Sequence, residues 1–115
     1  MNSNMKELSL HYNPSLECEF KLEEGKLVSN GYGYIDLKKI SKSPTGCGGT
    51  FTFKHKNDNK PLYSIARFHT AYIGSNCFEW LRNDLNLHFT IKDGDDYGRL
   101  PENTSHPLIH VNFRD

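Results

Sequence analysis

The sequence predicts a mainly β (α+β) fold, a single antiparallel sheet of about seven strands curled into a barrel or half-barrel, with one short helix near residues 76–85. Three observations predict this fold. Apolar and polar residues alternate with a period of two along most of the chain, short turn-forming segments separate the alternating runs, and only one run has helical spacing. The chain has 115 residues, the usual size of one domain, so residues 1–115 are expected to form one β-rich unit.

The first half of the chain predicts three strands. Residues 8–12 alternate before an Asn-Pro turn, and residues 16–22 then place apolar side chains on one face and charged ones on the other. A glycine-containing turn at 23–26 leads into a third strand, residues 27–37, which is expected to pair antiparallel with the second. Residues 38–50 are rich in glycine, serine and lysine and predict a long mobile loop, on which Cys47 is expected to be exposed.

The second half predicts further strands joined by turns. Residues 51–56 and 62–72 flank a polar turn and are expected to form a hairpin. Residues 87–91 alternate again before an Asp-Gly turn at 93–96. The last strand follows a loop between two prolines, and its inward-facing side chains are expected to be Ile109, Val111 and Phe113.

One segment predicts a helix. Asn76 can cap a first turn while Glu79 reaches back to it, as in a capping box. The apolar residues at positions 77, 78, 81 and 85 would then share one helical face, and Asn86 would end the helix in a left-handed conformation.

Charge and cysteine content exclude several classes of function. Lys and Arg number 14, and so do Asp and Glu, so no overall field attracts nucleic acid or anionic lipid. The amino terminus lacks the apolar stretch of a signal peptide, and no apolar run is long enough to cross a bilayer. Three widely spaced cysteines suit free thiols in a reducing compartment, so a cytoplasmic protein without a membrane partner is expected.

Two segments resemble parts of an RNA-binding sheet. Gly31-Tyr32-Gly33-Tyr34-Ile35 resembles the first ribonucleoprotein motif of cold-shock and related domains, although Asn30 stands where that motif has a basic residue. Phe51-Thr52-Phe53-Lys54-His55 resembles the second such strand, and lysines make residues 38–60 locally basic. The resemblance implies stacking of single-stranded bases. The ligand-binding residues it indicates are Tyr32, Tyr34, Lys54, His55 and Lys56.

A second resemblance concerns a thiol. Asn76-Cys77-Phe78 at the start of an apolar helix resembles the cysteine helix of papain-like hydrolases, because a helix amino terminus favours thiolate. In that family a histidine acts as base and a polar residue orients it. The resemblance implies that His88 or His110, with Asn112, would take these roles beside Cys77.

The remaining patterns favour binding without catalysis. His106 and His110 would lie ~13 Å apart in a strand, too far to share an ion, so neither metal nor cofactor is expected. By elimination, the first hypothesis is a non-catalytic binding or accessory domain for a protein, peptide or small ligand, with a homodimer as one expected assembly. Single-stranded nucleic-acid binding and thiol hydrolysis are the two alternatives.

Overall fold

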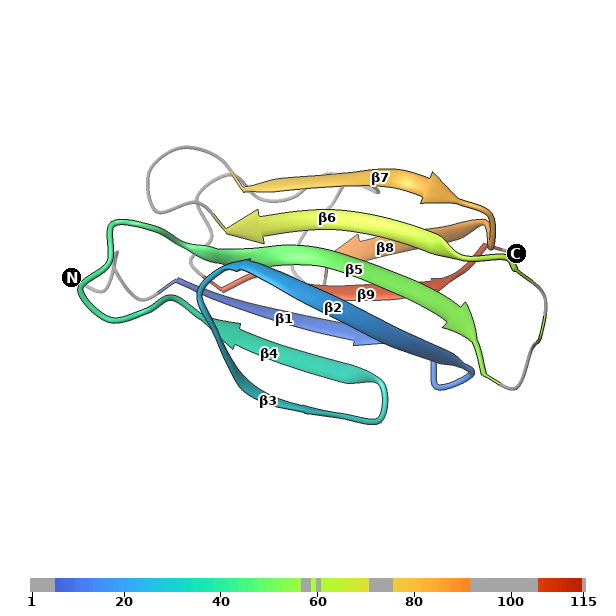
Figure 1. Ribbon diagram of the computed structural model, residues 1–115, viewed down its shortest axis with the longest axis horizontal. Helices are drawn as coiled ribbons and strands as arrows, with labels where there is room; N and C mark the ends of the chain where they lie inside the picture. The colour runs from blue at the N-terminus through green and yellow to red at the C-terminus, as the bar shows by residue number, and fades with distance from the viewer. Residues whose placement is uncertain (1–5, 57–58, 60, 71–75, 92–105, 115) are drawn as a thin grey trace.

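Two β-sheets packed face to face make up the fold (Figure 1). The computed structural model describes residues 6–56, 59, 61–70, 76–91 and 106–114. Within these residues there are nine strands and no helix. The strands are β1 (Glu7–Tyr12), β2 (Leu16–Glu24), β3 (Lys26–Gly31), β4 (Tyr34–Lys38), β5 (Cys47–His55), β6 (Ser64–Thr70), β7 (Cys77–Asn83), β8 (Leu87–Ile91) and β9 (Leu108–Phe113).

The sheet order makes the fold an open sandwich. One sheet has the order β3-β4-β1-β9-β8 and the other the order β2-β5-β6-β7. The mainly β prediction is therefore confirmed, whereas the barrel or half-barrel is wrong, because two separate sheets cover each other instead of one sheet curling on itself. The antiparallel prediction fails at one pair of neighbours, since β1 and β9 run parallel.

The core fills the space between the sheets with alternate side chains from most strands. Its centre is aromatic: Phe51 stacks on Phe68 with 4.5 Å between ring centroids, and Phe53 lies edge-on to Tyr12. Both sheets contribute, because period-two alternation turns one face of each strand inward. The fully buried large side chains include Phe51, Phe53, Phe68, Leu8, Leu10, Leu16, Ile35, Leu37, Leu87, Ile109 and Val111.

The helix predicted near residues 76–85 is wrong. Residues 77–83 form the edge strand β7, which pairs antiparallel with β6. Phe78 packs on Phe68 and Trp80 on Phe53, at centroid distances of 5.2 and 6.3 Å, so the two inward residues are two apart, as in a strand. Asn86 does adopt a positive φ of 52°, but it does so in the short connection from β7 to β8.

The third predicted strand is two strands. β3 and β4 form a hairpin whose turn contains Gly33 at φ 79°, so the run from 27 to 37 is broken in its middle. The expected pairing of the second and third strands is also wrong. β2 and β3 belong to different sheets, and the chain passes between them at Gly25, whose φ of 88° suits glycine.

The loop predicted at 38–50 is shorter than expected. β5 begins at Cys47, so residues 47–50 are strand. Cys47 is fully buried, not exposed, and its Sγ lies 3.2 Å from Oγ1 of Thr70. The thiol is thus part of the packing between β5 and β6.

Several predicted strands are confirmed. The segments at 8–12, 16–22 and 87–91 are strands within two residues at each end. The segment at 51–56 is also strand, although β5 begins four residues earlier, and β5 and β6 form the expected hairpin. Ile109 and Val111 are buried on β9 as predicted. The turn at 93–96 and residues 71–72 lie outside the described residues. No helix able to span a bilayer occurs in the part of the chain that the structure describes.

Candidate functional site: a groove between two strand edges

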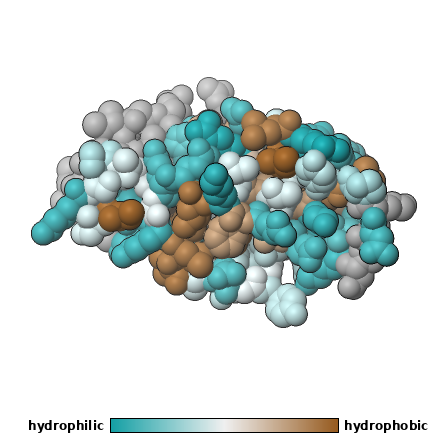
Figure 2. All heavy atoms as spheres, in the orientation of Figure 1, coloured by the Kyte–Doolittle hydropathy of each residue, from teal (hydrophilic) through white to brown (hydrophobic). Residues whose placement is uncertain are grey.

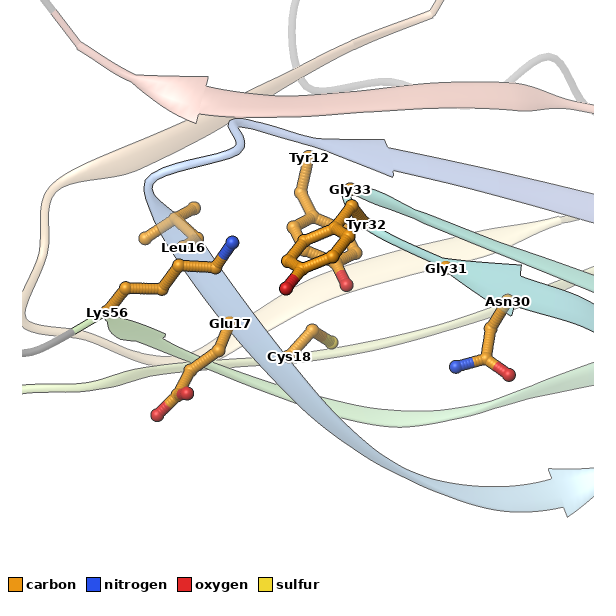
Figure 3. A pocket seen from close by; sticks show the side chains of 9 residues that line it. All are labelled: Tyr12, Leu16, Glu17, Cys18, Asn30, Gly31, Tyr32, Gly33 and Lys56. Atoms are coloured by element: carbon orange, nitrogen blue, oxygen red, sulfur yellow. The ribbon is translucent and has the colours of Figure 1, made fainter.

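A groove of about 600 Å³ opens on the side of the sandwich where β2 and β3 lie (Figure 3). It lies between the two sheets, because β2 is the outermost strand of one and β3 the outermost strand of the other. Both sheets contribute to its walls. The lining residues are Tyr12, Leu16, Glu17, Cys18, Asn30, Gly31, Tyr32, Gly33 and Lys56.

The two strands that border the groove each have an unpaired edge among the described residues. β2 pairs only with β5, and β3 pairs only with β4. β3 is exposed along almost its whole length, and Leu27 and Val28 are 41% and 59% exposed. Hydrophobic surface is visible along the lower side of the molecule in Figure 2, where Figure 1 shows β3. This side of the sandwich therefore offers apolar surface and free backbone groups together.

Tyr32 and Lys56 meet at the mouth of the groove. Tyr32 occupies the β3–β4 turn and is 88% exposed, and the Lys56 ammonium lies 4.3 Å from the centroid of its ring. Lys56 follows β5 directly, and its backbone N–H donates to the carbonyl of Ser15 at 2.9 Å. The pair is thus a cation–π contact that joins the two sheets across the groove.

The floor of the groove keeps its ionisable groups neutral. Burial raises the pKa of the Tyr12 hydroxyl, and the neighbouring Cys18 raises it further. Burial is also the main reason that the pKa of the Cys18 thiol is raised far above its ordinary value. Both groups stay protonated at neutral pH, so Cys18 is not a thiolate nucleophile. The charged residues of the lining are Glu17 and Lys56.

The structure brings together only two of the five ligand-binding residues predicted from sequence. Tyr32 and Lys56 share the groove, whereas Tyr34 lies on the outer face of β4, where its ring covers Gly31 and approaches His11 at 6.4 Å. The other two lie elsewhere. Lys54 is opposite Glu17 on the outer face of the four-stranded sheet, and His55 stacks on Phe113.

Tyr32 and Tyr34 therefore do not share one face of a strand. The prediction placed them two apart in a continuous strand, but the turn at Gly33 separates their environments. A two-ring stacking platform of the kind found on ribonucleoprotein sheets is not formed by these two residues.

The residues predicted for a thiol hydrolase are also dispersed. Cys77 begins strand β7, next to His69 of β6, and so is not the first residue of a helix. His88 and Asn112 are cross-strand neighbours on the other sheet, and His110 lies two positions further along the same strand pair, opposite Thr90. The structure thus separates the proposed nucleophile from its proposed base and orienting residue.

Sequence reasoning missed most of the groove. Tyr12, Leu16 and Cys18 belong to the apolar faces of the strands predicted at 8–12 and 16–22, and a period of two by itself indicates a core position and not a groove. Asn30, opposite Ile35 in the β3–β4 ladder, also faces the groove. The clue in the sequence was Asn30, a polar residue near the end of a strand. The sequence does not show, however, that β2 and β3 lie side by side, and the groove depends on that arrangement.

Comparison with known proteins does not place the chain in a family. No family model matches it, and no curated protein sequence is significantly similar to it. Among the described residues, no group of three or more His, Cys, Asp or Glu side chains is arranged to hold a metal ion. The groove is therefore interpreted from its own chemistry.

Proposed function

We propose that this chain is a binding domain that takes up an extended peptide segment in the groove between β2 and β3. The observation that carries the proposal is that one groove is bordered by two strand edges with which no other described strand pairs. An extended peptide satisfies such an edge with backbone hydrogen bonds and adds a strand to the sheet. It also covers exposed apolar side chains of β3, here Leu27 and Val28.

β3 suits strand addition better than β2. Its residues are exposed on both faces, so an added strand meets little steric hindrance. A bulge between Leu27 and Ser29 disturbs the β3–β4 ladder and limits indiscriminate edge pairing. Specificity then has to come from side chains that enter the groove beside the new strand.

The lining indicates which side chains would fit. The face of Tyr32 away from Lys56 can stack an aromatic or other flat apolar group, and the Lys56 ammonium can pair with a carboxylate. Tyr12, Cys18 and Asn30 offer neutral hydrogen-bonding groups. We therefore propose a peptide in which an acidic residue lies close to an aromatic one.

Panning a phage-displayed random peptide library on the immobilised chain tests this function. Peptides with adjacent aromatic and acidic residues should be enriched, and their binding should weaken about tenfold in Tyr32→Ala and in Lys56→Ala, as expected for loss of 1 to 2 kcal/mol. The matched control is another cation–π pair, Arg82 over Tyr63 at 4.1 Å, since neither residue lines the groove. Equal losses in both pairs would contradict the assignment.

A second function has one observation in its favour. The exposed ring of Tyr32 could stack one base of a single-stranded nucleic acid, and the ammonium of Lys56 beside it could bind a phosphate. Retention of a labelled single-stranded oligonucleotide that falls with rising salt and is lost in Tyr32→Ala would favour this reading. No retention at low salt would remove it.

A further inference from the structure

Three side chains on the outer face of the five-stranded sheet lie in contact with one another in sequence. Oγ of Ser9 lies 2.8 Å from Nε2 of His106, and Nδ1 of the same imidazole lies 3.1 Å from Oε2 of Glu7. A hydroxyl, an imidazole and a carboxylate are therefore joined in that order. Each ring nitrogen has one partner, and the partners are chemically different.

This arrangement would let a proton pass from the hydroxyl of Ser9 to Nε2 of His106. With the ring proton on Nδ1, the N–H of His106 lies on the side of the Glu7 carboxylate, and Nε2 is left as an acceptor for the hydroxyl of Ser9. The Glu7 carboxylate lies where a residue that orients the imidazole ring would lie. The arrangement is that of a nucleophile, a base and a residue that positions the base.

Strand geometry explains why the three groups meet. Glu7 and Ser9 are two apart on β1, so they share the face opposite to the core residue Leu8. β9 runs parallel to β1, and the backbone N–H of Ser9 donates to the carbonyl of Pro107 at 3.1 Å. This bond holds the residue next to His106 against the middle of β1.

In this site the side chain of His106 is accessible to solvent, whereas that of Ser9 is enclosed. The side chains of His106 and Glu7 are 49% and 35% exposed, whereas Ser9 is 8% exposed. A substrate would therefore approach from the side of the imidazole. Asp36 lies opposite Ser9 on β4 and accepts a hydrogen bond from Ser29, so its charge disfavours anionic substrates at this place.

We propose that Ser9, His106 and Glu7 form an acyl-transfer site for small uncharged esters, with Ser9 as nucleophile, His106 as base and Glu7 as the positioning residue. Ser9 Oγ bonds to the ester carbonyl carbon while its proton passes to Nε2 of His106. The imidazolium then gives that proton to the departing alkoxide, which leaves as an alcohol. His106 then takes a proton from water as the water oxygen bonds to the acyl carbon. The bond between that carbon and Ser9 Oγ breaks, the imidazolium returns the proton to Oγ, and the carboxylic acid leaves.

This inference is independent of the peptide groove. The groove includes Tyr12, whose side chain belongs to the inward set of β1, whereas Glu7 and Ser9 lie on the outward face of the same strand. Variants that remove one activity should leave the other unchanged. The two proposals can therefore fail separately.

Labelling with a fluorophosphonate probe tests the nucleophile directly. The Ser9 oxygen would form a bond to phosphorus as the phosphorus–fluorine bond breaks, fluoride leaves, and the serine proton passes to His106 and then to buffer. The full-length chain should gain one adduct, located on Ser9 by tandem mass spectrometry. Ser29→Ala is the matched control, because Ser29 is a serine of the same sheet bonded to a carboxylate and not to a histidine.

Hydrolysis of p-nitrophenyl acetate tests the base and its positioning residue. His106→Gly should lower the rate by about 10² or more, and added imidazole should restore part of it in that variant but not in Ser9→Ala. Glu7→Gln should lower the rate with the fold intact, and Glu7→Asp should recover part of the loss, which a purely structural role would not produce. Circular dichroism and melting of each variant check that it folds.

Three results would overturn the proposal. The first is wild-type protein that takes up no fluorophosphonate, and the second is an adduct on any residue other than Ser9. The third is a folded Ser9→Ala variant that hydrolyses the ester at the wild-type rate. Each can be read without the His106 variants, so a variant that fails to fold does not leave the proposal undecided.

Discussion

The ammonium of Lys56 lies over the ring of Tyr32, 4.3 Å from its centroid, and so connects the two sheets of the sandwich. Tyr32 belongs to the turn between β3 and β4, and Lys56 follows the end of β5. At this side of the sandwich the chain passes at Gly25 from β2 in one sheet to β3 in the other, so the two strands do not pair with each other. The contact thus marks the mouth of the groove that we interpret as the binding site.

The first prediction concerns the strength of this contact. A double-mutant cycle with Tyr32→Ala and Lys56→Ala should give a coupling of about 0.5 to 1 kcal/mol in the free energy of unfolding, the range of exposed cation–π pairs. Urea denaturation of the four proteins measures it. The same cycle on Tyr63 and Arg82 is the comparison. If the changes in the free energy of unfolding for Tyr32→Ala and Lys56→Ala simply add in the double variant, the contact does not stabilise the fold.

The second prediction concerns the turn that carries Tyr32. Gly33→Ala should lower the free energy of unfolding by about 1 kcal/mol or more, because the residue has φ 79° and an added Cβ would lie 3.0 Å from the carbonyl oxygen of Tyr12. Lys42 also has a positive φ, of 64°, so Lys42→Gly should have the opposite sign and stabilise slightly. Thermal melting of both variants tests this, and a tolerated Gly33→Ala would argue against the turn.

The third prediction separates a strand from a helix at residues 77–83. In a helix Phe78 and Leu81 would share a face, but in β7 Phe78 packs inward and Leu81 is 53% exposed. Leu81→Ser should therefore change the free energy of unfolding by no more than about 0.5 kcal/mol, whereas Phe78→Ser should cost about 3 kcal/mol or more. Similar costs at the two positions would contradict the strand.

The fourth prediction concerns alkaline pH. Burial raises the pKa of the Cys47 thiol from its ordinary value of 9.0 to about 11, so the folded state holds this proton more tightly than the unfolded state. The contribution of the thiol to stability is complete below pH 9 and is lost as pH rises towards 11. Urea midpoints from pH 8 to about pH 11 should fall more steeply in the wild type than in Cys47→Ala. Parallel curves would contradict the burial of this thiol.

Sequence alternation predicted the local structure well where one face of a strand is covered by the core. β1, β5 and β8 show this, because Leu8, Phe51 and Phe89 belong to inward sets that the period of two defines. The helix at 76–85 was mispredicted because the apolar residues of this segment fit both the helical period of 3.6 residues and the strand period of two. Packing of Phe78 and Trp80 against Phe68 and Phe53 decides in favour of the strand.

Sheet order could not be predicted in the same way. The parallel contact of β1 with β9 joins residues about a hundred positions apart, and alternation carries no information on which strands are neighbours. The candidate sites depend on this order. The groove needs β2 and β3 at one side of the sandwich, and the Ser9 to His106 bond needs β9 beside β1.

The central claim is that an extended peptide joins the free edge of β3 in the groove. Hydrogen–deuterium exchange of the chain, with and without a peptide selected by panning, measures it most directly. We predict slower amide exchange in residues 26–31 and in the facing residues 16–18, with no change in residues 77–83 of β7, the edge strand opposite β2 in the four-stranded sheet. Protection confined to 77–83, or no protection in 26–31 at saturating peptide, would contradict the proposed site.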